Sequence, residues 1–288
     1  MTRIDGSRDN WSAGEAGRGH GTRSFPMDGP ILRTTEMERS RSRPVRLVAS
    51  DIDGTLLGDD AAAARFRSTW EALAEGERPL LIYNSGRSSE DILSLVDANL
   101  LPAPDYVIGG VGTMITEGRM RTRMEAFIKE LGPALDSSAI AAIFGSIEGA
   151  ILQVAADQNP HKASWHLHDA EQERIHDIAA RLRSTGLDVK LIYSSSRDID
   201  ILPRTGGKGS ALAWICRELA VDLDEVVVAG DTGNDLEMFE MPLVRGVIVA
   251  NALAELCRAV AQDRRHYLAR ASHADGVIEG LRHLGVVR

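Results

Sequence analysis

Runs of consecutive apolar residues alternate with helix-like periods from Arg46 to the end of the chain. Four of these runs cover residues 47–49, 80–83, 226–229 and 247–250. Strands that are apolar at successive positions are buried on both faces, as in a parallel sheet covered by helices on either side. The pattern therefore predicts an α/β fold built on a doubly wound parallel sheet.

Each of the four runs is followed by polar residues, namely Asp51, Asn84 with Ser85, Asp231, and Asn251. In doubly wound sheets, ligands bind at the carboxyl ends of the strands. We therefore expect four separate strands to bring polar groups to one edge of one sheet.

The pattern changes between residues 119 and 203, where two helical stretches are each followed by two short β-like runs. This αββαββ order predicts a small α+β unit inserted in the larger domain, where it would form a lid over the polar edge. We expect a core domain of residues 45–118 and 204–288 and a cap domain of residues 119–203. The six segments of the cap are residues 134–144, 151–154, 164–167, 171–182, 189–193 and 199–202.

Residues 1–44 are rich in Gly, Arg, Ser and Asp and show almost no apolar spacing. Such a segment buries too little surface to offset its ordering entropy, so we predict a disordered tail. It lacks the apolar stretch of a signal peptide, and its scattered acids are unlike a transit peptide. Met27 and Met37 leave open a translation start further along the chain.

The composition of the 288-residue chain limits its partners. A net charge of −9 disfavours binding to nucleic acid or to anionic membranes. No apolar run approaches the ~18 residues of a membrane span. The two cysteines, Cys216 and Cys257, form no CxxC pair, so we expect buried thiols and a cytoplasmic protein. A monomer is favoured, although the sequence leaves the oligomeric state open.

Three polar motifs fall at the predicted strand ends and helix starts. DIDGT places Asp51 and Asp53 before a glycine that allows the chain to turn. NSGR offers the Ser85 hydroxyl and the Gly86 backbone N–H at a helix start, where anions bind. GGKG puts Lys208 at another helix start, where a positive charge is unfavourable unless an anion lies nearby.

A fourth motif, GDTGND, adds Asp231, Asn234 and Asp235 after a buried strand. Together with the two acids of DIDGT, it gathers four carboxylates. At ~4 Å and an effective dielectric of about 20, each like-charged pair costs on the order of 4 kcal/mol. The cluster therefore needs a cation, and Mg²⁺ fits because it takes only a few protein carboxylates and keeps several waters.

In this order the four motifs resemble those of the haloacid dehalogenase superfamily of phosphatases, from about residue 46 to residue 288. The resemblance implies a magnesium-dependent phosphatase in which Asp51 forms an aspartyl-phosphate, while Asp53 acts first as general acid and then as general base. The implied magnesium ligands are Asp51, Asp53 through its backbone, Asp231 and Asp235, and the implied phosphate contacts are Ser85, Gly86, Lys208 and Asn234.

Within this superfamily the inserted unit, with PDYVI, QNP before Lys162 and GVIVANA, resembles the sucrose-phosphate phosphatase group. NSGR, GGVGTM, SWHLHDAE and ADGVIEGLRHLG are most similar to its bacterial mannosylfructose-phosphate phosphatases, because cyanobacterial sucrose-phosphate enzymes usually carry Thr where this chain has Ser85. The resemblance implies a non-reducing disaccharide phosphate as substrate, with mannosylfructose-phosphate preferred over sucrose-6-phosphate. The polar residues expected to contact the sugar are Arg87, Gln158, Asn159, Lys162 and His166.

Other interpretations remain open. The substrate is alternatively another sugar or osmolyte phosphate, such as glucosylglycerol-phosphate. A phosphatase-like domain that only binds a sugar phosphate is disfavoured, because all four acids are present. A polar outer strand face would equally explain His161, His166 and His168. The expected partners are the small-molecule sugar phosphate and the glycosyltransferase that makes it.

Overall fold

A computed structural model describes residues 43–288 of the chain. The predicted disordered tail therefore lies outside the described residues, apart from its last two positions. One of these, Arg43, pairs with Asp222 and Asp224. The described residues fall within a single unit, Ser42–Arg288.

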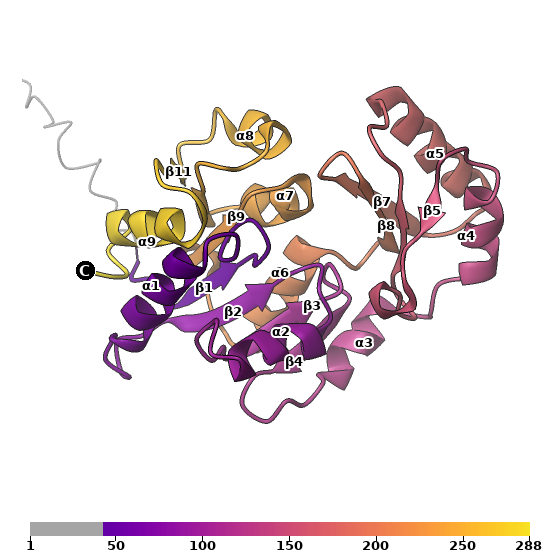
Figure 1. The fold of residues 1–288 in the computed structure, drawn as a ribbon. Coiled ribbons are helices and arrows are strands. Elements are labelled where there is room, and N and C mark those ends of the chain that lie inside the picture. Colours follow the sequence, from indigo (N-terminus) through magenta and orange to yellow (C-terminus); the bar gives the residue numbers. More distant parts are fainter. Residues whose placement is uncertain (1–42) are drawn as a thin grey trace, which may run out of the picture. The chain divides into compact units, whose positions relative to one another are not determined.

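The larger sheet has seven strands in the order β11-β10-β9-β1-β2-β3-β4 (Figure 1). All neighbouring pairs are parallel except β3 and β4. The predicted doubly wound α/β fold is thus confirmed, with β1 at the centre of the sheet. The strands are β1 (Leu47–Ser50), β2 (Leu80–Asn84), β3 (Tyr106–Gly109), β4 (Met114–Glu117), β9 (Val226–Gly230), β10 (Arg245–Ile248) and β11 (His266–Leu268).

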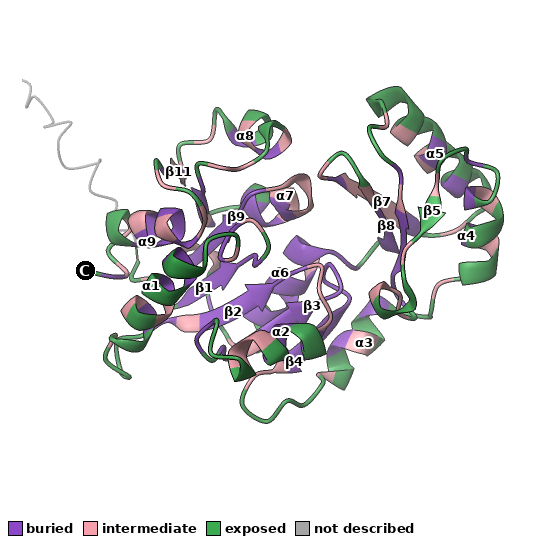
Figure 2. Ribbon diagram, in the orientation of Figure 1, coloured by how far each residue is buried: buried purple, intermediate pink, exposed green. Residues whose placement is uncertain are grey.

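Helices cover both faces of this sheet. Successive side chains of each strand point to opposite faces and so pack against both helix layers. Val48 packs with Phe66 and Trp70 of one helix layer, whereas Ala49 packs in the other layer with Trp214. Figure 2 shows the buried strands between these layers. The covering elements are α1 (Asp60–Glu71), α2 (Ser89–Asp97), α6 (Lys208–Glu218), η2 (Leu223–Glu225), η3 (Gly233–Asp235), α7 (Leu236–Glu240), α8 (Ala254–Val260) and α9 (His273–His283).

A second sheet has four antiparallel strands in the order β5-β6-β8-β7. It has its own apolar cluster, in which Phe144 stacks on Trp165 with ring centroids 4.1 Å apart. The order α4-β5-β6-α5-β7-β8 matches the predicted αββαββ unit. Its elements are α4 (Ser137–Phe144), β5 (Ile151–Leu152), η1 (Ala155–Asp157), β6 (Ala163–His166), α5 (Gln172–Ser184), β7 (Val189–Ser194) and β8 (Asp198–Pro203). The preceding helix α3 (Glu125–Leu131) lies in the predicted cap range but packs in the apolar cluster of the large sheet, where its Phe127 ring lies 5.3 Å from that of Trp214.

The two sheets support a division of the chain close to the predicted one. We propose that residues 45–118 and 204–288 fold as a core domain and residues 119–203 as a cap domain, and the terms core and cap denote these ranges below. Across residues 43–288, no helix has the length and apolar character needed to cross a membrane.

Candidate active site

The polar groups that follow β1, β2 and β9 meet at one edge of the large sheet. Strand register places Ser50 beside Tyr83 on one side and beside Ala229 on the other. The residues just beyond these positions include Asp51, Ser85 and Asp231, so the parallel topology brings together groups that are up to 180 positions apart. The strand-end pattern predicted such convergence for four strands, and the fourth group, Asn251 after β10, also reaches this edge, where its Nδ2 donates to Gly54 O at 2.7 Å.

Lys208 lies at the centre of the acidic cluster and is fully buried. Its Nζ atom donates to Asp51 Oδ1 at 2.7 Å and to Asp235 Oδ1 at 2.6 Å. Burial by itself lowers the pKa of Lys208, but Asp235 and Asp51 raise it above its ordinary value. Lys208 is therefore a cation that neutralises part of the charge of the acids around it.

Burial disfavours the charged form of the carboxyl groups in the cluster and so raises the pKa values of two of them. Asp51, Asp231 and Asp235 each offer an oxygen within 4.8 Å of the others. Burial raises the pKa of Asp51 well above its usual range, although Lys208 opposes the shift. Burial, and then the charge of Asp235, raises the pKa of Asp231 to about 6. The cluster thus holds more negative charge than one lysine stabilises.

These acids fit a magnesium ion by the chemistry of their donor atoms. Asp51 and Asp231 present hard carboxylate oxygens, which Mg²⁺ prefers. Asp235 has fewer free lone pairs, because its Oδ2 accepts the backbone N–H of Asp231 at 2.9 Å and of Thr232 at 3.0 Å. Since its other oxygen bonds to Lys208, Asp235 is better suited to hold the surrounding groups in place than to bind the ion directly.

Gly54 is needed for the close approach of the first motif to the fourth. Its φ is +79°, and a Cβ there would lie 2.8 Å from Asp231 Cγ. The next residue, Thr55, donates its hydroxyl to Asp231 Oδ1 at 2.9 Å. The turn after β1 therefore both makes room for Asp231 and fixes its orientation.

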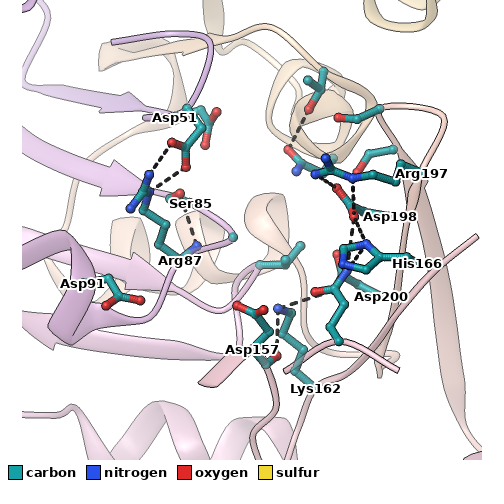
Figure 3. A pocket seen from close by; sticks show the side chains of 18 residues that line it. Asp51, Ser85, Arg87, Asp91, Asp157, Lys162, His166, Arg197, Asp198 and Asp200 are labelled. Atoms are coloured by element: carbon teal, nitrogen blue, oxygen red, sulfur yellow. Dashed lines mark hydrogen bonds and ion pairs between the residues drawn. The ribbon is translucent and has the colours of Figure 1, made fainter. Parts of the chain in front are cut away.

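Asp53 points away from the buried cluster and pairs with Arg87. The guanidinium Nε and Nη2 atoms donate to its two carboxylate oxygens, each at 2.7 Å. Asp53 is 53% exposed and Arg87 37%. Figure 3 shows Arg87 close to Ser85 and Asp51, on the core side of the cavity. Arg87, predicted to contact the sugar, thus pairs with one of the two catalytic candidates and lines the same cavity as both.

A cavity of about 430 Å³ opens over these groups and is lined by both core and cap. Of the predicted phosphate contacts, Ser85, Gly86 and Asn234 line it, while Lys208 lies below. Of the predicted sugar contacts, Arg87, Lys162 and His166 line it, as Figure 3 shows. Most of the predicted residues therefore share one cavity.

Gln158 and Asn159, also predicted to contact the sugar, do not line this cavity, so their contact with the sugar stays a prediction. Gln158 pairs with the backbone of Ser164, accepting its N–H at 2.8 Å and donating to its C=O at 2.9 Å. Asn159 donates to Thr113 Oγ1 at 2.9 Å and accepts from His161 N at 2.8 Å. Both side chains thus hold the loop before β6 in place.

The cap side of the cavity contains polar residues that the prediction missed. Asp198 Oδ1 bonds to His166 Nδ1 at 2.8 Å and accepts from Gln153 Nε2 at 3.2 Å. Asp200 lies 3.5 Å from Lys162 Nζ, and both residues are buried. The sequence DIDIL contains the signal, because alternation in a strand places both acids on the face opposite the buried isoleucines.

The family model of sucrose-6F-phosphate phosphohydrolases matches residues 44–285. The chain belongs to this family. Mannosylfructose-phosphate phosphatase of Agrobacterium fabrum is 48% identical over 245 residues, which cover 85% of this chain and 98% of that protein. Sucrose-phosphatase 1 of Nicotiana tabacum is 32% identical over 87% of this chain but only 61% of its own length. The chain thus spans about three fifths of such plant relatives.

Solved structures agree with the predicted resemblance. A sucrose-phosphatase from Synechocystis in complex with sucrose and phosphate matches with a TM-score of 0.77 and 32% identity, covering 84% of this chain and 98% of that one. A haloacid dehalogenase subclass IIB sugar phosphatase matches with a TM-score of 0.61 and 16% identity, covering 84% of this chain and all of that one, which supports the fold alone. The predicted membership of the haloacid dehalogenase superfamily is confirmed.

Proposed function

We propose that this protein is a magnesium-dependent phosphatase that hydrolyses a non-reducing disaccharide phosphate through an aspartyl-phosphate on Asp51. The arrangement of Asp51 supports this most directly. It is buried at the end of β1, bonded to Lys208, and followed two residues later by Asp53 at the mouth of the same cavity. A shielded nucleophile with a separate, accessible carboxyl group suits a two-step phosphoryl transfer.

In the first step Asp51 Oδ attacks phosphorus, and the bond between phosphorus and the sugar oxygen breaks. Asp53 gives a proton to the departing oxygen, then as a carboxylate takes one from the water that hydrolyses the intermediate. Asp53 must leave its pairing with Arg87 to do this. Ser85, Gly86 and Lys208 would hold the phosphate oxygens, and Asn234 supports them from the cavity wall.

Mg²⁺ would be held by the carboxylates of Asp51 and Asp231 and by the backbone carbonyl of Asp53, with Asp235 behind them. When bound, it neutralises charge on the phosphate and on the acids. Without the ion, the negative charge of these acids would repel a phosphate dianion.

The polar residues on the cap side of the cavity would bind and recognise the sugar. Besides Arg87, we assign Lys162, His166, Gln153 and Asp198 to this role, because carboxylate, amide, imidazole and ammonium groups complement hydroxyls that both donate and accept. Since Asp198 accepts from Nδ1 of His166, the Nε2 atom is left for a hydroxyl of the ligand.

The substrate prediction is tested with a panel of purified sugar phosphates. We expect kcat/KM for mannosylfructose-phosphate to exceed that for sucrose-6-phosphate by about tenfold or more, because an epimer with a misplaced hydroxyl leaves a buried polar group unpaired. The two compounds differ at carbon 2 of the pyranose, which the core motifs do not reach. Fructose 6-phosphate and glucose 6-phosphate are the controls. Equal turnover of these monosaccharides would defeat the disaccharide assignment, whereas a sucrose-6-phosphate preference would defeat only the choice of epimer.

Asp53→Asn is expected to lower kcat by about 10²–10⁴-fold, the usual loss for a missing general acid and base. The amide still accepts from Arg87, so folding should be unaffected. Asp91→Asn is a matched control, because Asp91 lines the same cavity without a proposed chemical role. It should stay within about threefold of the wild type. Similar losses in the two variants would mean that Asp53 contributes only its charge.

A further inference from the structure

The edge strand β7 of the cap contacts the core on the side of the active site. The cap sheet ends in β7, and this strand packs against η3, the turn that carries Asp235. In Figure 1, β7 and β8 are the cap strands nearest α7. Two separate sets of polar contacts hold β7 in this place, one at its start and one just beyond its end.

The first set involves Lys190, near the start of β7, and Glu237 of α7, which form an ion pair. The same carboxylate accepts the backbone N–H of Gly209 at 3.3 Å. Gly209 directly follows the buried Lys208, and Gly207 before it has a φ of +110° and no side chain to block the pair. The start of β7 is therefore tied to the segment that positions Lys208.

The second set is centred on Glu255, in the first turn of α8. Its Oε1 accepts the backbone N–H of Gly233 at 2.7 Å and that of Ser195 at 3.3 Å. A Cβ on Gly233 would lie 2.8 Å from Oε1, so the close contact depends on glycine. The backbone N–H of Leu253 donates to Asp231 O at 2.7 Å, which fixes the start of α8 to the acidic loop. One carboxylate thus joins cap and core.

The contact on the cap side is made by a tight turn that lines the cavity. Ser195 and Ser196, between β7 and β8, have φ values of +55° and +49°, and Arg197 N donates to Ser194 O at 3.1 Å. Two-residue turns of this type favour Asn and Gly, which serine does not replace without cost. Ser194, Ser195 and Arg197 line the cavity. The contact with Glu255 thus holds a turn whose own sequence does not favour its conformation.

We propose that Glu255 is a positioning residue. It aligns the polar residues on the cap side of the cavity with the core segments that carry Lys208 and Asp231, and the Lys190–Glu237 pair assists it. The proposal rests on the proposed function and adds a link within it. Neither Glu255 nor Lys190 lines the cavity that Asp51 and Asp53 share. Their loss should therefore impair a substrate that uses the cap side of the cavity more than one that uses only the core.

Glu255→Ala, Glu255→Gln and Lys190→Ala test this with two substrates, mannosylfructose-phosphate and p-nitrophenyl phosphate. For Glu255→Ala we expect kcat/KM to fall about tenfold with the sugar phosphate, mainly through KM, because a hydrogen bond to a charged group is lost. With p-nitrophenyl phosphate it should change by less than about threefold. Glu255→Gln should recover most of the loss, since its amide oxygen still accepts. Lys190→Ala should show the same selectivity with a smaller loss, about two- to fivefold. Glu240→Ala, an exposed acid at the end of α7, is the matched control.

Hydrogen exchange at the amides of Ser195 and Gly233 gives a second readout that needs no activity. Both should exchange faster in Glu255→Ala than in the wild type or in Glu240→Ala. Equal losses of kcat/KM with both substrates would overturn the proposal, because Glu255 would then only shape the core loop of residues 230–235. Unchanged kinetics or unchanged exchange would also overturn it. If the wild type hydrolysed neither substrate, the proposed function would fail, while the exchange data would still decide whether Glu255 joins cap and core.

Discussion

Asp51→Asn is expected to abolish turnover while leaving the fold intact. The amide has the shape of the carboxylate but no nucleophilic oxygen, so no covalent intermediate can form. The fold should survive because the amide oxygen of asparagine can still accept from Lys208 Nζ, which donates to Asp51 at 2.7 Å. Lys208 also keeps Asp235 as its second partner. We expect kcat to fall by more than about 10⁴-fold.

Phosphate release measures the loss, and thermal unfolding checks that the variant is folded. Acid-quenched wild-type enzyme, taken during turnover, should carry phosphate on the peptide that contains Asp51, and the variant should carry none. Turnover by Asp51→Asn near the wild-type rate would show that another group attacks phosphorus. Phosphate found on a different peptide would locate that group.

The core of the site could be predicted because short motifs and sheet topology act together. The carboxyl ends of parallel strands must meet, so residues after β1, β2 and β9 were bound to converge wherever the motifs stood in the chain. Lys208 shows the logic most clearly. A positive charge at a helix start predicted a nearby anion, and the structure supplies two, Asp51 and Asp235, before any phosphate binds.

The cap was harder to predict, because its polar residues have two competing uses. Gln158 and Asn159 look like ligand contacts in sequence, yet both are used by backbone and side-chain partners within the protein. Only tertiary contacts reveal which use applies. Asp198 and Asp200 were readable from the alternation along β8, but their partners Gln153, His166 and Lys162 lie on other segments.

The role of Glu255 and the pairing of Arg87 with Asp53 could not be predicted from the sequence, because both depend on long-range contacts. Glu255 meets Ser195 across 60 positions, and Arg87 meets Asp53 across 34. No local period or motif marks either contact. A helix-start glutamate such as Glu255 is more simply explained by the helix dipole, which favours acids in the first turn.

The charges at the site determine what metal removal should do. Asp51, Asp231 and Asp235 each have a carboxylate oxygen within 4.8 Å of the others, and within residues 43–288 Lys208 is the cation that pairs with Asp51 and Asp235. A phosphate dianion would add two further negative charges beside Asp51. At an effective dielectric of about 20, each repulsive pair at ~4 Å costs on the order of 4 kcal/mol, which one lysine does not offset.

Chelation with EDTA is therefore expected to stop turnover, and added Mg²⁺ to restore it. Calcium should restore it poorly, because its larger and less regular coordination shell would misplace Asp51 relative to phosphorus. Asp231→Asn should weaken Mg²⁺ binding measured by calorimetry, whereas Asp91→Asn, on the cavity rim, should bind as the wild type does. EDTA already saturated with Mg²⁺ controls for inhibition by the chelator itself. Full activity in metal-free buffer would mean that Lys208 and the backbone N–H groups suffice to hold the phosphate, and the magnesium assignment would then be wrong.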